Sequence, residues 1–154
     1  MLKPILLVED NPNDRELTLI ALQSSNLAND VVVAKDGAEA LDYLFRRNSF
    51  AERAQGNPAF ILLDLRLPKV NGLDVLETIK ADKQLQTVPV AVLTSSDKDT
   101  DLADAYQLGV NSYLLKPVAL GSFVAAVTKL GLFWGVLNEP PPESLPFSPA
   151  PDKD

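Results

Sequence analysis

The chain has 154 residues, a formal net charge of −7 and an isoelectric point near 4.5. An acidic surface disfavours binding to the nucleic-acid backbone and to anionic lipid, and no basic run offsets this. The chain contains no cysteine and no histidine. These absences exclude disulfide bonds, thiolate chemistry, and the commonest general base and transition-metal ligand. Any chemistry must therefore come from carboxylates, hydroxyls, lysine, arginine or the backbone.

Short apolar runs alternate along the chain with longer amphipathic segments. Strands are expected at residues 4–8, 31–34, 59–64, 88–94 and 112–116. Helices are expected at residues 11–25, 36–47, 72–82, 97–109 and from residue 120 onward, with a polar loop at 48–58. For the first helix, Asn11 is the expected N-cap and Pro12 the first helical residue. The spacing predicts that Leu17, Ile20 and Ala21 form the buried face of the first helix, and Leu120, Phe123, Val124 and Val127 that of the fifth.

Five strand–helix units in succession predict an α/β fold, in which a doubly wound five-stranded parallel sheet carries helices on both faces. The strands are runs of Val, Ile and Leu, as is typical of strands buried on both sides. From residue 139 the chain is rich in proline, serine and acidic residues. We therefore expect a domain at residues 1–130, an apolar extension at 131–138 and a flexible proline-rich tail at 139–154.

Polar side chains follow four of the predicted strands at the point where each strand ends. Glu9 and Asp10 follow the first strand, Asp64 ends the third, Thr94 ends the fourth, and Lys116 ends the fifth. Taken singly, each has an ordinary explanation, such as a helix cap or a surface lysine. Because the carboxyl ends of parallel strands meet at one edge of the sheet, where α/β proteins bind ligands, we expect these groups to converge.

Clustered carboxylates repel one another, and a hard divalent cation such as Mg²⁺ relieves that repulsion. A lysine beside them offers a second positive charge for phosphoryl oxygens. A carboxylate next to Mg²⁺ and lysine is the chemical equipment for forming an aspartyl phosphate.

With these residues in place, the sequence resembles the receiver domain of two-component response regulators. The matched residues are Glu9, Asp10, Asp64, Thr94, Tyr113 and the pair Lys116-Pro117, and the resemblance extends over residues 3–130. It implies the flavodoxin-like receiver fold with strand order 2-1-3-4-5. It also implies a protein that is not an enzyme in the usual sense, although it can assist its own phosphorylation and dephosphorylation.

The resemblance further implies a role for each matched residue. Asp64 would accept a phosphoryl group from a histidine kinase, and Asp10, Asp64 and the carbonyl of Arg66 would bind Mg²⁺, with Glu9 acting nearby through water. Lys116 would contact the phosphoryl oxygens and would precede a cis proline. Thr94 and Tyr113 would form the switch that follows phosphorylation.

Within this family the chain is most similar to the small regulators of cyanobacterial and bacterial phytochromes. The polar insert, the segments "LLDLRLPKVNG" and "VPVAVLTSS", and the pair Phe133-Trp134 carry this similarity. It implies a phytochrome-type kinase as partner. The chain departs from many receivers in having glutamate at position 9 and a large basic residue, Arg66, beside the phosphoryl site.

Three alternatives compete with this interpretation. A phosphatase of the haloacid-dehalogenase type also uses an aspartyl phosphate, but needs a second carboxylate where this chain has Arg66. A flavodoxin would need a phosphate-binding loop after the first strand, where this chain has "EDNPND". The third is an interaction module that works without phosphorylation.

The segment from Leu130 to Leu137 carries more apolar side chains than one helical face can bury on a single domain. Apolar patches of this kind usually mark an interface, and Trp and Phe are frequent anchors there. The segment either folds back on its own domain or meets a second copy of the chain, and we expect the second: a homodimer across the side formed by the fourth helix, the fifth strand and the fifth helix. The chain has no secretory signal and no apolar run long enough to span a bilayer, so a cytoplasmic location is expected.

Overall fold

The computed structural model describes residues 3–24, 29–95 and 100–129, the last three of these by their backbone only. The strands are β1 (Ile5–Val8), β2 (Val31–Ala34), β3 (Phe60–Asp64), β4 (Val90–Thr94) and β5 (Ser112–Leu115). The helices are α1 (Pro12–Ser24), α2 (Gly37–Phe45), α3 (Gly72–Ala81), α4 (Thr100–Gln107) and α5 (Leu120–Lys129). All neighbouring strands pair in parallel, in the order β2-β1-β3-β4-β5. The predicted α/β fold and strand order are confirmed.

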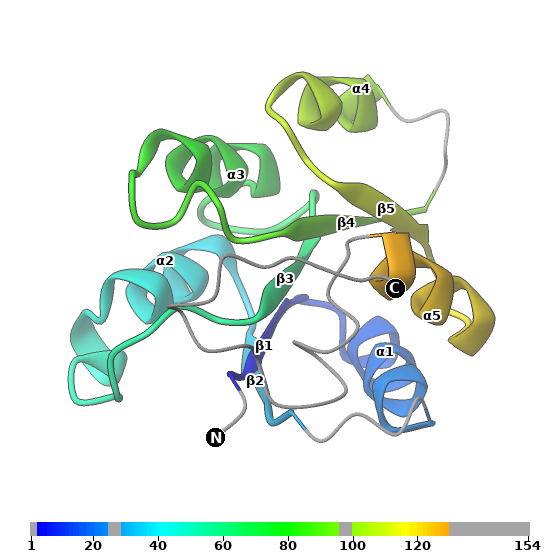
Figure 1. Ribbon diagram of the computed structural model, residues 1–154, viewed down its shortest axis with the longest axis horizontal. Coiled ribbons are helices and arrows are strands. Elements are labelled where there is room, and N and C mark those ends of the chain that lie inside the picture. The colour runs from blue at the N-terminus through cyan, green and yellow to red at the C-terminus, as the bar shows by residue number, and fades with distance from the viewer. Residues whose placement is uncertain (1–2, 25–28, 96–99, 130–154) are drawn as a thin grey trace, which may run out of the picture.

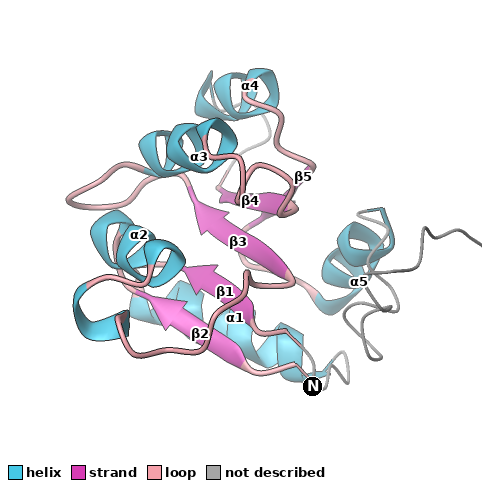
Figure 2. Cartoon of the chain, turned by 60° about the vertical axis from the view of Figure 1, so that its left-hand side comes forward, coloured by secondary structure: helices cyan, strands magenta, loops and turns pink. Residues whose placement is uncertain are grey.

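The helices form one layer on each side of the sheet. Figure 1 shows α1 and α5 on one side and α2, α3 and α4 on the other, and Figure 2 shows the strands running side by side between them. Alternate residues of each strand face opposite layers, so Leu62 packs toward α1 and α5 while Ile61 and Leu63 pack toward the other three helices. Both faces of the central strands are fully apolar, which explains why their sequences do not alternate.

Side-chain caps define where the helices begin. Asn11 Oδ1 accepts the backbone N–H of Asp14 at 2.9 Å, which confirms Asn11 as the N-cap before Pro12. Asp36 caps α2 in the same way, and Asn71 Oδ1 accepts the backbone N–H of Leu73 at 2.8 Å at the start of α3. These caps fix the turns that leave the carboxyl ends of β1, β2 and β3.

The faces predicted for α1 and α5 were partly wrong. Leu17 and Ile20 are 43% and 49% exposed, and α1 instead buries Thr18, Ala21 and Leu22. In α5, Leu120 and Val124 are also exposed, whereas Phe123 and Ala126 are buried. Helical spacing identifies residues that share a face, but two overlapping apolar stripes were available in each helix, and spacing alone does not decide which of them packs on the sheet.

The predicted loop at 48–58 contains a short 3-10 helix (Asn48–Phe50) and is fastened to the end of α2 by Arg53. The Arg53 guanidinium donates to the carbonyl oxygens of Tyr43 and Leu44 and lies 4.1 Å from the centre of the Tyr43 ring. Phe50 packs edge-on against the same ring. The loop at 48–58 is therefore ordered against the end of α2, where carbonyl groups of the last turn accept hydrogen bonds from the Arg53 cation.

Among the described residues, no helix is long and apolar enough to cross a membrane.

The close approach of α3 to the end of β3 generates a stability prediction. A Cβ atom at Gly72 would collide with the backbone of Asp64 and Leu65, while one at Gly121 in α5 would meet open space. Gly72→Ala should therefore lower the free energy of unfolding by about 1–3 kcal/mol, because the backbone must shift. Gly121→Ala, the matched control, should raise it by about 0.5 kcal/mol, because alanine restricts the unfolded chain. Urea denaturation measures both, and a Gly72→Ala protein as stable as the native one would contradict the packing described.

Candidate functional site

Four strands deliver polar residues to one edge of the sheet, as the parallel topology requires. Glu9 and Asp10 follow β1, Asp64 is the last residue of β3, and Thr94 is the last residue of β4. Lys116 follows β5, and its backbone N–H donates to the carbonyl oxygen of Thr94 at 2.8 Å. The apolar residues of β1, β3 and β4 are buried, so the backbone that holds Glu9, Asp64 and Thr94 is rigid.

The ammonium group of Lys116 lies at the centre of the site. Its Nζ is 2.8 Å from Asp64 Oδ2, 3.0 Å from Glu9 Oε1 and 3.2 Å from Asp14 Oδ2. The lysine side chain is 16% exposed, so water screens these ion pairs less than it screens pairs on the surface. Burial opposes the charge of Lys116, but the nearby carboxylates of Asp64 and Glu9 outweigh it and hold its pKa above the usual range.

Glu9 is fully buried. Its Oε2 accepts the backbone N–H of Asn11 at 3.1 Å, and the Arg15 guanidinium donates to its backbone carbonyl. Its Oε1 has no hydrogen bond of good geometry among the described residues, despite the nearby ammonium of Lys116. Burial and the neighbouring carboxyl of Asp64 together raise the pKa of Glu9 from 4.5 to about 7, against the lowering effect of Lys116.

Glu9, Asp10 and Asp64 form a cluster that can hold a metal ion. Each offers one carboxylate oxygen, and these oxygens lie within 4.8 Å of one another. The buried Oε1 of Glu9 lacks a hydrogen-bond partner among the described residues, so it can accept a hydrogen bond from a metal-bound water. The donors are all oxygen atoms, so the site suits a hard cation and not zinc or copper.

Arg66 lies on the loop that follows Asp64. Its backbone N–H donates to Asp64 Oδ1 at 3.0 Å, which orients the carboxylate. Its side chain is 66% exposed and its Nη2 lies 3.8 Å from Asp101 Oδ2 in α4. The predicted role of its carbonyl group as a metal ligand stays a prediction.

The two predicted switch residues lie on β4 and β5. Thr94 is buried at the end of β4. Tyr113 is half-buried, and its ring meets that of Tyr106 in α4 edge-on, with 6.3 Å between the centres. The peptide bond between Lys116 and Pro117 is cis, as expected.

Asp14 belongs to the site, but the sequence did not identify it. It is in the first turn of α1, where an acidic residue is usually explained by the helix dipole. The available signal was its position four residues after Asp10, because one helical turn can bring a side chain back to the same edge of the sheet.

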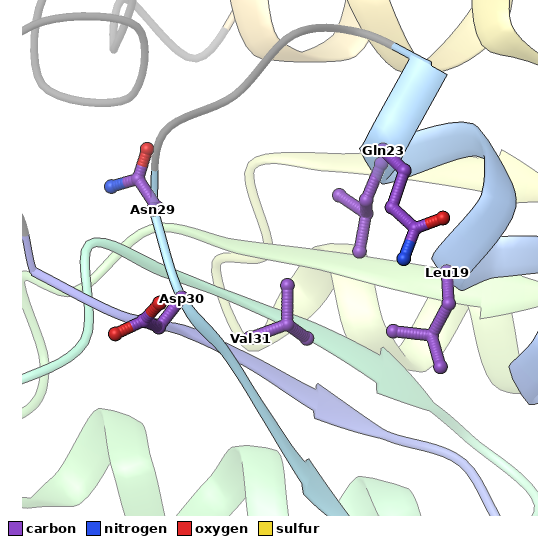
Figure 3. A pocket seen from close by; sticks show the side chains of 6 residues that line it. Leu19, Gln23, Asn29, Asp30 and Val31 are labelled. Atoms are coloured by element: carbon purple, nitrogen blue, oxygen red, sulfur yellow. The ribbon is translucent and has the colours of Figure 1, made fainter.

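A separate pocket lies between α1 and the entry to β2, at the opposite end of the strands. It is lined by Leu19, Leu22, Gln23, Asn29, Asp30 and Val31. Figure 3 shows these side chains coming from α1 and from the start of β2. Its described lining residues include one carboxylate and no cation, so they do not form a cluster of acids around an ammonium like that at the acidic site.

The comparisons with known proteins agree with this geometry. Residues 5–128 match the family model of the response regulator receiver domain. The chain is 41% identical over 137 residues to the probable methanogenesis regulatory protein FilR2 of Methanothrix harundinacea, covering 89% of this chain and 86% of that protein. It is 36% identical over 132 residues to the response regulator Rcp1 of Synechocystis, covering 86% of this chain and 88% of Rcp1.

Solved structures give the same result. The bacteriophytochrome response regulator RtBRR is 59% identical, with a TM-score of 0.84 over 94% of this chain and 87% of that one. The phosphorylated cyanobacterial phytochrome response regulator RcpA is 40% identical, with a TM-score of 0.71 over 87% and 94% of the two chains. The Mn²⁺-bound form of Rcp1 is 35% identical, with a TM-score of 0.68 over 86% and 92%.

These matches cover most of both chains, so they apply to the described fold as a whole. Membership of the family implies a histidine kinase as partner, not a classical enzymatic activity. The chain belongs to the response regulator receiver-domain family and is a two-component response regulator homologous to those of phytochromes.

Proposed function

We propose that Asp64 is the residue that accepts the phosphoryl group. The observation that carries this proposal is the position of its carboxylate, which is nearly buried at the end of β3 and lies 2.8 Å from the ammonium of Lys116. Glu9 and Asp10 bring two more carboxylates within 4.8 Å. A carboxylate flanked by a cation and further acids has the surroundings that phosphoryl transfer to aspartate requires.

The reaction is an in-line displacement at phosphorus. A carboxylate oxygen of Asp64 attacks the phosphorus of a phosphohistidine, the bond between phosphorus and nitrogen breaks, and the imidazole leaves with a proton from solvent. The backbone N–H of Arg66 holds Oδ1 of Asp64, while Lys116 faces Oδ2 and is placed to pair with the incoming oxygens. Hydrolysis of the mixed anhydride by water would restore Asp64.

Magnesium is the cation that we assign to this site. Asp10 and Asp64 would bind it directly with the carbonyl of Arg66, and Glu9 would act through water. The ion supplies positive charge to the phosphoryl oxygens when bound. Mg²⁺ prefers a few carboxylates together with waters and phosphate, which suits a small, partly open cluster.

Thr94 and Tyr113 are proposed to transmit phosphorylation to the side of the domain formed by α4, β5 and α5. A phosphoryl group is a strong hydrogen-bond acceptor, and the hydroxyl of Thr94 can move to donate to it. Tyr113 already contacts α4 through Tyr106. Phosphorylation should shift NMR resonances on this side of the domain. Shifts limited to the Asp64 loop would contradict the coupling.

The similarity to phytochrome regulators supports a phytochrome-type histidine kinase as the phosphodonor. A cytoplasmic location follows from that partnership and is part of the same proposal. Arg66 argues against a phosphatase, because hydrolases that turn over an aspartyl phosphate need an acid there. A phosphorylation-independent module would not need the full set of Asp10, Asp64 and Lys116.

Phosphorylation of Asp64 can be tested directly. Incubation with Mg²⁺ and acetyl phosphate should add one phosphoryl group to the native protein, measured as the intact mass. Asp64→Asn should abolish the mass gain, because the amide is a poor nucleophile, and chelation of Mg²⁺ should also prevent it. Asp74→Asn, an exposed residue of α3 outside the cluster, is the matched control and should behave as the native protein. Persistent phosphorylation of Asp64→Asn would refute the assignment.

The pKa of Glu9 predicts how stability depends on pH in the absence of metal. Burial, together with Asp64, raises this pKa from 4.5 to about 7, so the folded chain binds the proton more tightly than the unfolded chain. The stability that Glu9 contributes is therefore complete below pH 4.5 and is lost as the pH rises through 7. Between pH 5 and pH 8 the free energy of unfolding of the native protein should fall by about 2 kcal/mol relative to Glu9→Gln. Urea titrations with a chelator measure this, and a constant difference would contradict it.

We also propose a homodimer that uses the segment from residue 130 to 137, which lies outside the described residues. The side of the domain formed by α4, β5 and α5 supports it, since Tyr106, Leu115 and Leu120 expose large apolar side chains there. The domain boundary at 130, the extension at 131–138 and the tail at 139–154 stay predictions. Sedimentation at micromolar concentration should give a dimer, and Phe133→Ala with Trp134→Ala should give a monomer. A native monomer, or a double variant that still dimerises, would refute this interface.

A further inference from the structure

The ammonium of Lys116 has three N–H donors, and three carboxylates lie within 3.2 Å of its nitrogen atom. Glu9 and Asp64 belong to the expected site, but the third partner is Asp14 of α1, whose Oδ2 lies 3.2 Å from Nζ. Nζ donates hydrogen bonds to Asp64 and Asp14 and forms an ion pair with Glu9, so it is already engaged before any phosphoryl group arrives. A phosphoryl oxygen that pairs with Lys116 must compete with these acids.

Asp14 is held in place by its backbone. Its N–H donates to Asn11 Oδ1 and its carbonyl accepts the hydroxyl of Thr18, so the turn that carries it is fixed at both ends. Its side chain is 31% exposed, whereas that of Glu9 is fully buried. Of the two acids that pair with Lys116 besides Asp64, Asp14 is the one that water can solvate when the pair opens.

We propose that Asp14 is a positioning residue that competes with phosphoryl oxygens for Lys116 and thereby weakens retention of the phosphoryl group. This inference rests on the proposed role of Asp64. Removing the charge of Asp14 would leave one N–H of Lys116 available and would take a negative charge away from an incoming anion. The same removal would weaken attraction for a divalent cation. The two affinities therefore change in opposite directions.

A purely structural role for Asp14, as a first-turn acid of α1, predicts a different pattern. Loss of helix stability would disturb the site and weaken the binding of cation and anion together. Opposite changes in the affinities for anion and cation therefore indicate competition for Lys116, whereas a parallel loss of both indicates a structural role.

The test measures binding of beryllium trifluoride, a phosphoryl mimic, at saturating Mg²⁺ by ¹⁹F NMR, and binding of Mg²⁺ alone by calorimetry. Asp14→Asn should bind the fluoride about threefold to fivefold more tightly than the native protein, as expected for one partly exposed ion pair. It should bind Mg²⁺ about twofold more weakly. Asp14→Ala repeats the loss of charge, and Asp14→Glu should restore the native values. Glu16→Gln, an exposed residue of α1, makes the same charge change as a control and should alter neither affinity.

The outcomes distinguish a failure of the role proposed for Asp14 from a failure of the role proposed for Asp64. If the native protein binds the fluoride and both charge-removing variants bind it equally or more weakly, the role of Asp14 is refuted while Asp64 stands. Equal gains for Glu16→Gln would show an effect of net charge and refute the role as well. If the native protein binds no fluoride, the proposed function of Asp64 fails, and the inference about Asp14 fails with it.

Discussion

The ion pairs around Lys116 are the interaction on which the site depends. They join β5 to α1 and β3, at positions 102 and 52 residues apart in the chain. Several carboxylates at one sheet edge would otherwise repel one another in a region with little water. A single buried ammonium offsets that repulsion, and its own desolvation is offset by the acids that surround it. The clustered carboxylates would be unfavourable without the buried ammonium, and the buried ammonium would be unfavourable without them.

The carboxylates and the ammonium stay close together because the backbone that carries them has very little freedom to move. β1, β3 and β4 are buried on both faces, and the loop after Asp64 is closed by a hydrogen bond from the N–H of Gly72 to the carbonyl of Leu65. Only glycine fits at position 72, where a side chain would meet the backbone beside Asp64. The position of the carboxylate is thus set by sheet packing and by one close backbone approach.

The sequence predicted the features that depend on backbone order. Continuous apolar strands that alternate with helices predicted a parallel sheet, and the residues that follow those strands were expected at one edge, where the structure places Asp64 and Lys116. Asp14 was missed because the order of the strands fixes where each strand ends, but not toward which neighbour a side chain in the first turn of a helix extends. The exposed Leu17 and Leu120 were misplaced because burial in α1 and α5 depends on which of two stripes packs on the sheet, and the stripes with Ala21 and Leu22 in α1 and with Phe123 and Ala126 in α5 do so.

The site is tied to two helices by ion pairs of unequal strength. Arg66 reaches Asp101 of α4 at 3.8 Å from a mostly exposed side chain, so that pair contributes about 0–1 kcal/mol. Lys116 reaches Asp14 of α1 at 3.2 Å from a side chain that is 16% exposed, where screening by water is much weaker. A change of charge at Asp64 acts on Lys116 directly and on Arg66 through a backbone N–H. Electrostatics therefore tie the acidic site more strongly to the start of α1 than to α4, while on the α4 side the ring of Tyr113 meets that of Tyr106 edge-on.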